Sequence, residues 1–386
     1  MSDSGSSTLQ GVLHVPNDRA DGSLREPDAL LRTLRLPGTG KSPVVPRRLI
    51  DEHRLRPGNL LTLSLRQNGK VKDVELVEDM KPDLWQQITP IYETVALDPG
   101  PQIRLEHDPK EVTSRIIDLI APIGLGQRGL IVAPPRTGKT VLMQNLAKGI
   151  HANNPQADLY LLLVDERPEE VTDMRRNVPG TVIASSNDND TRQHIDLCSL
   201  ASDRFKRLAE TGRDVIVLMD SLTRLGRAFN RGTNSGKLMS GGIDARALEI
   251  PKKIFGAARK IEGGGSLTII ATALVQTNSR MDDVIFEEFK GTGNMEITLD
   301  RKAANDRVFP AIWLANSATR KEENLIAPHH MPAIINIRKH LAAMPPIPAL
   351  KTLIQAVGQH PTNESFLKAM TPAAAQERVK RRAVGR

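Results

Sequence analysis

The feature that most constrains the fold is a series of continuous apolar runs that alternates with helical segments from about Thr113 onward. The runs are RGLIVA, DLYLLLVDE, GTVIASS, DVIVLMD and GSLTIIATAL, and stretches such as KTVLMQNLAKGIHAN, RPEEVTDMRRNV and DRFKRLAETG read as helices between them. Strands that are apolar at nearly every position are typical of a parallel sheet buried on both faces. We therefore predict an α/β domain over residues 113–345.

The residues before this domain have a different pattern. GVLHV and NLLTLSLR are rich in strand-forming residues, and LRPGN and QNGK supply turns, with Asn-Gly suited to a type I′ hairpin. We predict a small β-barrel over residues 9–80. The remaining segments are interpreted as a disordered tail (1–8), a proline-rich linker (81–112) and a C-terminal helical extension with a solvated basic end, ERVKRRAVGR (346–386).

Composition narrows the class of protein only a little. The 386 residues are enough for two domains, and the net charge of +8 with a pI near 9.6 favours polyanionic partners without requiring them. Residues 1–80 contribute only +1 of that charge, from 12 Lys or Arg and 11 Asp or Glu. The single cysteine, Cys198, excludes an intrachain disulfide and is expected to be a buried thiol. Without an apolar run of membrane-spanning length or a signal core, we expect a cytoplasmic protein with no membrane contact.

The stretch APPRTGKT, Ala133 to Thr140, ends as a phosphate-binding loop does. A strand leads into it and a helix begins at Lys139, so backbone N–H groups and the helix N-terminus can hold phosphate. Lys139 can reach the β- and γ-phosphates, and the Thr140 hydroxyl can bind Mg²⁺. The residues expected to bind ATP here are Pro135, Arg136, Thr137, Gly138, Lys139 and Thr140.

A second TGK sequence lies at LPGTGKS, residues 36–42. No apolar strand leads into it, and no clear helix begins at Lys41. We therefore expect Gly40, Lys41 and Ser42 to have no role in phosphate binding.

Two carboxylates follow apolar strands. Asp220 ends DVIVLMD, where it can bind Mg²⁺ or instead cap the helix that follows. Glu166 ends DLYLLLVDE, where it can orient the attacking water or instead form a cap or an ion pair with Arg167. We favour the metal role for Asp220, whereas the local pattern leaves the alternatives for Glu166 open.

Several stretches together resemble one family. DERPEEVTDM, DSLTRLGRAFN, SGKLMSGGIDARAL, KKIFGAARKIEGGGSLTIIATAL, EEFKGTGNMEITLDRK and SATRKEE closely resemble the transcription termination factor Rho family, the ring-shaped RNA-dependent ATPases and helicases of bacteria. The resemblance covers about residues 85–345, and the Ala-Pro-Pro start of the phosphate loop is also a feature of that family. It implies an OB-like barrel followed by a RecA-like P-loop ATPase domain, assembled as a hexamer with ATP sites between subunits.

The resemblance also implies roles for individual residues. Glu166 matches the catalytic glutamate that polarises water, and Arg320 matches the arginine finger that acts on the ATP of a neighbouring subunit. Lys139, Thr140, Arg136 and Asp220 match phosphate and metal residues, and Arg167 matches a nucleotide-site arginine. ATP and Mg²⁺ are the implied cofactors.

Two glycine-rich basic loops match the RNA-binding loops of the ring's central hole. NRGTNSGKLMSGG is read as a flexible loop that carries Lys237, and EEFKGTGNM carries Lys290 with Gly291 and Gly293. Lysines on such loops suit contacts to the RNA backbone, which carry no sequence information.

The N-terminal region departs from the family pattern. The family's helical bundle has no counterpart, and the motif usually written DGFGFLR is DGSLR here, Asp21 to Arg25, without either phenylalanine. Because each base stacked on an aromatic ring contributes about 1–3 kcal/mol, capture of single-stranded RNA by the barrel should be weak. Arg25 or the pair Arg47 and Arg48 could still contact phosphate.

These observations favour an ATP-driven 5′→3′ RNA translocase of the Rho type that promotes transcription termination. Its expected partners are single-stranded RNA, five further copies of the chain, and RNA polymerase or termination cofactors. The alternative is a regulatory subunit that joins rings of a full-length Rho or is recruited by a protein. A rotary ATPase subunit is disfavoured because of the two RNA loops.

Overall fold

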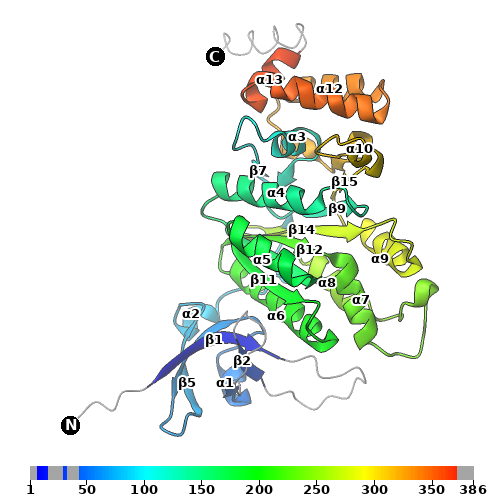
Figure 1. Ribbon diagram of the computed structural model, residues 1–386. Coiled ribbons are helices and arrows are strands. Elements are labelled where there is room, and N and C mark those ends of the chain that lie inside the picture. The colour runs from blue at the N-terminus through cyan, green and yellow to red at the C-terminus, as the bar shows by residue number, and fades with distance from the viewer. Residues whose placement is uncertain (1–6, 16–28, 33–42, 372–386) are drawn as a thin grey trace, which may run out of the picture.

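The computed structural model describes residues 7–15, 29–32 and 43–371, which form a small antiparallel sheet and a large α/β domain (Figure 1). The motif Asp21–Arg25, the stretch 40–42 and the basic end after Thr371 lie outside these residues. Within the described ranges, no helix is long and apolar enough to cross a membrane.

The N-terminal sheet has the strand order β3-β2-β1-β4-β5, and every neighbouring pair is antiparallel. The strands are β1 (Thr8–His14), β2 (Ala29–Arg32), β3 (Val44–Val45), β4 (Leu60–Leu65) and β5 (Val71–Val77), with α1 (Arg47–Glu52) and α2 (Pro82–Trp85) beside them. Leu13, Leu61, Leu63 and Trp85 are almost fully buried in its core. The sequence therefore predicted the OB-like sheet correctly, although its first strand already begins at Thr8.

The hairpin expected at QNGK joins β4 and β5, but its turn is not of type I′. Gly69 has a φ of +75°, whereas Asn68 does not have a positive φ. The amide of Gly69 donates to the carbonyl of Arg66 at 2.9 Å, and the amide of Arg66 donates to the carbonyl of Lys70 at 2.8 Å. A turn that is followed by a single left-handed glycine forms a three-residue hairpin loop with a bulge. In this loop only the glycine needs the left-handed conformation.

The large domain contains a nine-stranded sheet with the main order β11-β10-β12-β14-β9-β15-β16. The first six of these strands are mutually parallel, which confirms the predicted parallel α/β architecture. Their bounds are β9 (Arg128–Ala133), β10 (Asp158–Glu166), β11 (Thr181–Ser186), β12 (Asp214–Asp220), β14 (Ser266–Leu274) and β15 (Met295–Thr298). The remaining strands are β6 (Ala96–Leu97), β13 (Arg259–Ile261) and β16 (Ala318–Thr319), and a separate pair joins β7 (Gln102–Ile103) to β8 (Ile123–Gly124).

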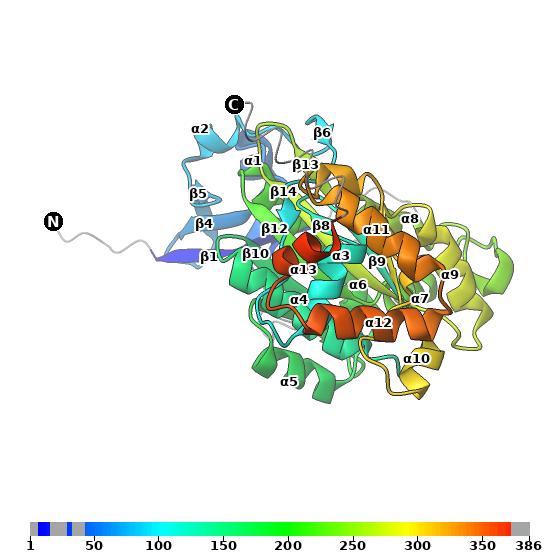
Figure 2. The same cartoon turned by 90° about the horizontal axis from the view of Figure 1, so that it is seen from above.

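Helices cover both faces of the sheet (Figures 1 and 2). One hydrophobic core contains residues of α3 (Val112–Ile120), α4 (Lys139–Asn153), α5 (Pro168–Asn177), α11 (Met331–Ala342), α12 (Pro346–Gly358) and α13 (Asn363–Met370). The other contains residues of α6 (Thr191–Glu210), α7 (Leu222–Gly232), α8 (Glu249–Gly256) and α9 (Arg280–Lys290), and a short helix, α10 (Arg301–Asn305), follows β15. Because α12 and α13 share the first core, the described part of the expected C-terminal extension, up to Thr371, packs on the ATPase domain.

Helix α6 begins twelve residues earlier than the predicted helix DRFKRLAETG. Asp190 accepts the amide of Gln193, whose side chain bonds back to the amide of Asp190, so a capping box starts the helix. Cys198 lies on its buried face, and burial raises the pKa of the thiol to about 12. The expectation of a buried cysteine is confirmed.

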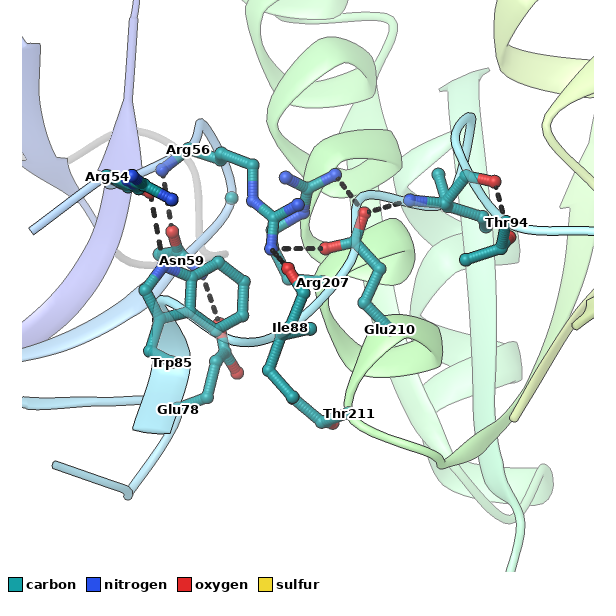
Figure 3. Close-up of polar contacts among 12 residues, drawn as sticks. Arg54, Arg56, Asn59, Glu78, Trp85, Ile88, Thr94, Arg207, Glu210 and Thr211 are labelled. Atoms are coloured by element: carbon teal, nitrogen blue, oxygen red, sulfur yellow. Dashed lines mark hydrogen bonds and ion pairs between the residues drawn. The ribbon is translucent and has the colours of Figure 1, made fainter. Parts of the chain in front are cut away.

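A cluster of charged side chains, here called the clasp, joins the small sheet to α6 (Figure 3). Arg204 donates to both oxygens of Glu78 at 2.6 and 2.5 Å, and Arg207 and Arg56 both contact Glu210, at 2.7 and 3.3 Å. Gly58 lies so close to α6 that a Cβ atom on it would be 2.2 Å from the carbonyl carbon of Asp203. The small sheet is therefore held directly against the ATPase domain.

The segment 81–112, expected as a linker, takes part in both domains. Trp85 is buried in the N-terminal core, and its indole N–H donates to the carbonyl of Arg54 at 3.2 Å. Ile91 is buried in a core of the ATPase domain, and β6 pairs with β13. Apolar residues within the proline-rich composition explain why this segment is packed.

Candidate nucleotide and nucleic-acid site

The phosphate loop lies at the carboxyl end of β9 and leads into α4, as predicted. Arg136 and Gly138 both have left-handed backbone conformations, with φ of +65° and +85°. The hydroxyl of Thr137 donates to the carbonyl of Pro134 at 2.7 Å and fixes the turn from inside, while Pro135 and Arg136 are exposed. A Cβ atom on Gly138 would lie in ordinary van der Waals contact with the ring of Phe309, at 3.4 Å, so it is the left-handed conformation that favours glycine at this position.

Lys139 and Asp220 meet at the carboxyl edge of the sheet. Nζ of Lys139 donates to the Asp220 carboxylate at 2.6 Å, and the hydroxyl of Thr272 donates to the same carboxylate at 2.7 Å. Ser221, not Asp220, caps α7, because its hydroxyl accepts the amide of Arg224 at 3.2 Å. The capping alternative for Asp220 is therefore wrong, and its buried carboxylate faces the phosphate loop.

Glu166 ends β10 beside these two residues and is only 2% exposed. Burial and the neighbouring Asp220 raise the pKa of its carboxyl group, and Lys139 and Arg224 oppose the shift. Its Oε2 atom has no hydrogen-bond partner and lies 3.8 Å from Nζ of Lys139. The expected ion pair with Arg167 does not form, since the Arg167 side chain is exposed, although the Arg167 backbone amide donates to Oε1 of Glu166 at 3.4 Å.

A further residue that contacts Glu166 is Arg224, which the sequence did not single out. Its Nη2 lies 3.0 Å from Oε1 of Glu166, and its Nη1 donates to the backbone carbonyl of Asp165. Asp165 has a φ of +54° at an irregularity between β10 and β11, which turns Glu166 out of the strand register. Arg224 therefore fixes both the backbone and the side chain at the end of β10.

Replacing Arg224 with alanine is expected to move the acid limb of the ATP hydrolysis profile to higher pH. A base must be ionised to accept a proton, and the Arg224 cation lowers the pKa of Glu166. Loss of the cation lets that pKa rise further, so activity is lost at a higher pH than in the parent. The measurement is kcat against pH, with Arg224→Lys as the control that keeps the charge. An unchanged acid limb in Arg224→Ala would show that Glu166 does not govern it.

The donor set at this edge suits a magnesium ion bound together with nucleotide phosphate. Thr140, the first residue after Lys139 on α4, offers a hydroxyl, and Asp220 offers a buried carboxylate held by Thr272. Oxygen donors of this kind are those that Mg²⁺ prefers. The unpartnered Oε2 of Glu166 is available to a water molecule next to such an ion.

Arg320 lies at the other end of the sheet from the phosphate loop. Its amide donates to the carbonyl of Asn294 at 2.9 Å, and the amide of Asn294 donates to Arg128 at the first residue of β9. The six residues of β9 lie between that edge and the loop, and from the first to the last of them the strand spans about 16 Å at roughly 3.3 Å per step. The side chain of Arg320 is exposed and cannot reach the phosphate loop of its own chain.

The loop that carries Lys237 is organised by hydrogen bonds. Asp244 accepts the amide and hydroxyl of Ser235 at 2.5 and 2.8 Å, and the amide of Ala245 donates to the carbonyl of Lys237 at 3.0 Å. Lys237 is exposed on one arm of the hairpin, next to Leu238, which is 76% exposed, and the turn lies at Ser240–Gly242. The expected flexible loop is thus a hairpin built around one aspartate.

Lys290 is the last residue of α9 rather than a loop residue. Gly291 ends the helix, and the chain returns through Gly293 to β15. The hairpin with Lys237 packs against the start of the same helix, where Gly241 approaches the carbonyl of Arg280. Both basic segments therefore border α9, one at each end.

Comparison with known proteins gives consistent matches. The ATP synthase alpha/beta family, nucleotide-binding domain, matches residues 113–319. A transcription termination factor Rho from Streptomyces coelicolor is 45% identical over 94% of this chain and 88% of its own. One from Pseudomonas aeruginosa is 50% identical over 74% of this chain and 68% of its own. Another, from Streptomyces lividans, is 49% identical over 82% of this chain, which spans only 46% of that relative's length.

A solved structure of an ATPase from the type III secretion system of pathogenic bacteria also matches. The TM-score is 0.59 with 23% sequence identity, over 71% of this chain and 85% of that one. At this identity the similarity supports the fold of the ATPase domain and nothing further.

Proposed function

Because the chain belongs to the transcription termination factor Rho family, we propose that it is an RNA-dependent ATPase that translocates 5′→3′ along RNA and promotes transcription termination. The observation that carries the proposal is the meeting of Lys139, Glu166 and Asp220 at one edge of the sheet, in a chain that matches a Rho over most of its length. The family match extends through both the N-terminal sheet and the ATPase domain.

The geometry supports separate roles for these residues in ATP hydrolysis. Lys139 and the backbone of residues 135–140 would hold the phosphates, with Arg136 and Arg167 as further cations beside them. Thr140 and Asp220 would hold Mg²⁺, which supplies charge neutralisation when it is bound. Glu166, oriented by Arg224, would accept the proton of the attacking water.

The position of Arg320 supports ring assembly if this residue is the arginine finger. A finger that cannot reach its own phosphate loop can serve only the loop of a neighbouring chain, so the complete ATP site needs two copies. A closed hexamer satisfies this need for every copy. RNA in the central hole would contact Lys237 and Lys290, with Gly291 and Gly293 giving the backbone close access.

The alternative of a purely regulatory subunit is not favoured. Each catalytic residue expected from the family is present, and Lys139, Glu166 and Asp220 lie in contact. A rotary ATPase subunit is equally disfavoured, because the highly identical relatives are Rho proteins. We assign the protein to the cytoplasm, where nascent transcripts are found, with RNA polymerase or a termination cofactor as its further partner.

The test is ATP hydrolysis by the purified protein with and without RNA. We expect single-stranded RNA to raise kcat at least about ten-fold, because RNA completes the arrangement at the subunit interface. Poly(U) and poly(C) should act similarly, since lysine contacts to phosphate do not distinguish bases. A rate that no RNA or single-stranded DNA increases would refute the proposed function.

A further inference from the structure

A groove of about 620 Å³ lies between α6 and α8, away from the phosphate loop. Ser199, Ser202, Asp203 and Lys206 line it from α6, and Ile250, Lys253, Ile254 and Gly256 line it from α8. Tyr92, from the segment between the two domains, forms the remaining wall. None of these residues belongs to the ATP site or to the two basic segments that border α9.

Tyr92 is held in place even though its side chain is 55% exposed. The preceding residue, Ile91, donates its amide to Glu210 of the clasp at 2.8 Å (Figure 3). The carbonyl of Ile91 accepts from the Thr94 hydroxyl at 2.8 Å and from Arg259 at 3.2 Å. These bonds fix the backbone next to Tyr92, and the Arg259 guanidinium and the Lys206 ammonium lie 4.9 and 5.7 Å from the centre of its ring. The exposed part of the ring is a surface on which a planar base can stack.

The charge of the groove is positive. Lys206 pairs with Asp203 at 2.6 Å, whereas Lys253 is exposed and Arg259 lies with its guanidinium 4.9 Å from the centre of the Tyr92 ring. No ion pair joins either of these two residues to a carboxylate in the described part of the chain. An exposed ring surrounded by cations and hydroxyl groups is typical of surfaces that bind single-stranded nucleic acid.

The groove also connects the two regions that RNA is expected to meet. At one end, Asp203 lies against Gly58 of the N-terminal sheet. At the other end, α8 is joined to α9 by the ion pair of Lys252 with Glu288, two residues before Lys290. Arg128 continues the basic surface beyond Arg259, and its Nε donates to the carbonyl of Thr292 at 3.2 Å.

We infer that this groove is an RNA-binding site that holds single-stranded RNA on its way from the N-terminal sheet to the loops around α9. Phosphates lie against Lys253, Lys206 and Arg259, and a base stacks on the exposed part of Tyr92. The inference rests on the proposed RNA-dependent function and adds a contact surface to it. It also supplies, within the ATPase domain, an aromatic contact of the kind that the DGSLR motif lacks.

The experiment measures binding of fluorescent oligouridylate to the assembled full-length protein over a range of salt concentrations, without ATP hydrolysis. Tyr92→Ala should weaken binding of a long oligouridylate about ten-fold, the effect of one lost stacked base. Lys253→Glu should reduce the slope of log affinity against log salt by about 0.7, the value for one lost phosphate contact on a single strand. Photocrosslinking of 4-thiouridine RNA should attach it to the peptide that contains Tyr92.

One control variant preserves the aromatic ring of the groove, and the other changes a charge outside the groove. Tyr92→Phe retains the ring and should bind like the parent. Lys351→Glu makes the same charge change at an exposed residue of α12, at the end of the molecule away from the N-terminal sheet (Figure 1). Parental affinity and salt slope in both groove variants would overturn the inference. An effect of Lys253→Glu with none for Tyr92→Ala would also overturn it, because that pattern describes a site for acidic protein segments.

Failure of this inference differs from failure of the proposed function. The binding measurement needs no hydrolysis, so it tests the groove even if RNA does not stimulate the ATPase. Conversely, if RNA stimulates hydrolysis and the groove variants bind RNA like the parent, the groove is rejected as an RNA-binding site and the proposed function stands.

Discussion

Arg320→Ala is expected to abolish RNA-stimulated ATP hydrolysis, with kcat falling by about 10³- to 10⁵-fold, the range measured for arginine fingers. The affinity for ATP should stay close to that of the parent, because Arg320 lies at the opposite end of β9 from its own phosphate loop. The measurement is steady-state hydrolysis together with binding of a fluorescent ATP analogue. Loss of ATP binding in this variant would contradict a role in the neighbouring site.

Mixed rings test the same prediction independently. The Arg320→Ala chain keeps an intact phosphate loop, and the Lys139→Ala chain keeps an intact Arg320. Where the phosphate loop of the first chain faces Arg320 of the second, the interface contains one complete ATP site. Neither variant should hydrolyse ATP alone, whereas a mixture assembled from both should recover a measurable fraction of the parental rate. A mixture as inactive as its components, in rings shown to contain both chains, would mean that the finger does not act between copies.

Lys139→Ala should lower kcat by about 10²- to 10³-fold, the usual loss when one preorganised donor to developing charge is removed. The structure adds a second effect, because Lys139 compensates the charges of two buried carboxylates, Asp220 at 2.6 Å and Glu166 at 3.8 Å. Without this cation the Glu166 carboxyl group should hold its proton to higher pH, which weakens proton acceptance, and the buried Asp220 carboxylate loses its charged hydrogen-bond donor. Hydrolysis and binding of the ATP analogue should therefore both decline.

Lys148→Ala is the matched control for this prediction. Lys148 is on the same helix, nine residues further on, and its side chain is exposed. It should hydrolyse ATP like the parent. More than a tenth of the parental rate in Lys139→Ala would exclude the assigned role.

The sequence predicts those parts of the site whose geometry is local. The phosphate loop needs a strand, a turn and a helix in succession, and Gly138, Lys139 and Thr140 are adjacent in the chain. Asp220 could be placed because carboxyl ends of parallel strands meet at one edge of a sheet. Its capping alternative could not be decided, because the cap depends on which of two neighbouring residues turns toward the helix.

Contacts between distant segments could not be predicted in this way. Arg224 meets Glu166 only because α7 starts beside the end of β10, and neither residue has a local pattern that indicates the other. The ion pair of Glu78 with Arg204 joins residues 126 positions apart. In the sequence, Arg204 and Arg207 read as ordinary helical charges, and only the approach of the small sheet makes them buried partners.

Helix α6 connects two parts of the protein, because its start contacts residues next to Glu166 and its end belongs to the clasp. Near its start, the His194 side chain is hydrogen-bonded to Ser185 and lies 3.9 Å from Asp165, the residue before Glu166. Its last two turns carry Arg204, Arg207 and Glu210 of the clasp. The helix is about 30 Å long, so a rotation of the whole helix by roughly 5° about its start would displace its other end by about 2.5 Å. Helix α6 therefore gives one continuous structural connection between the backbone next to Glu166 and the ion pairs that hold the N-terminal sheet.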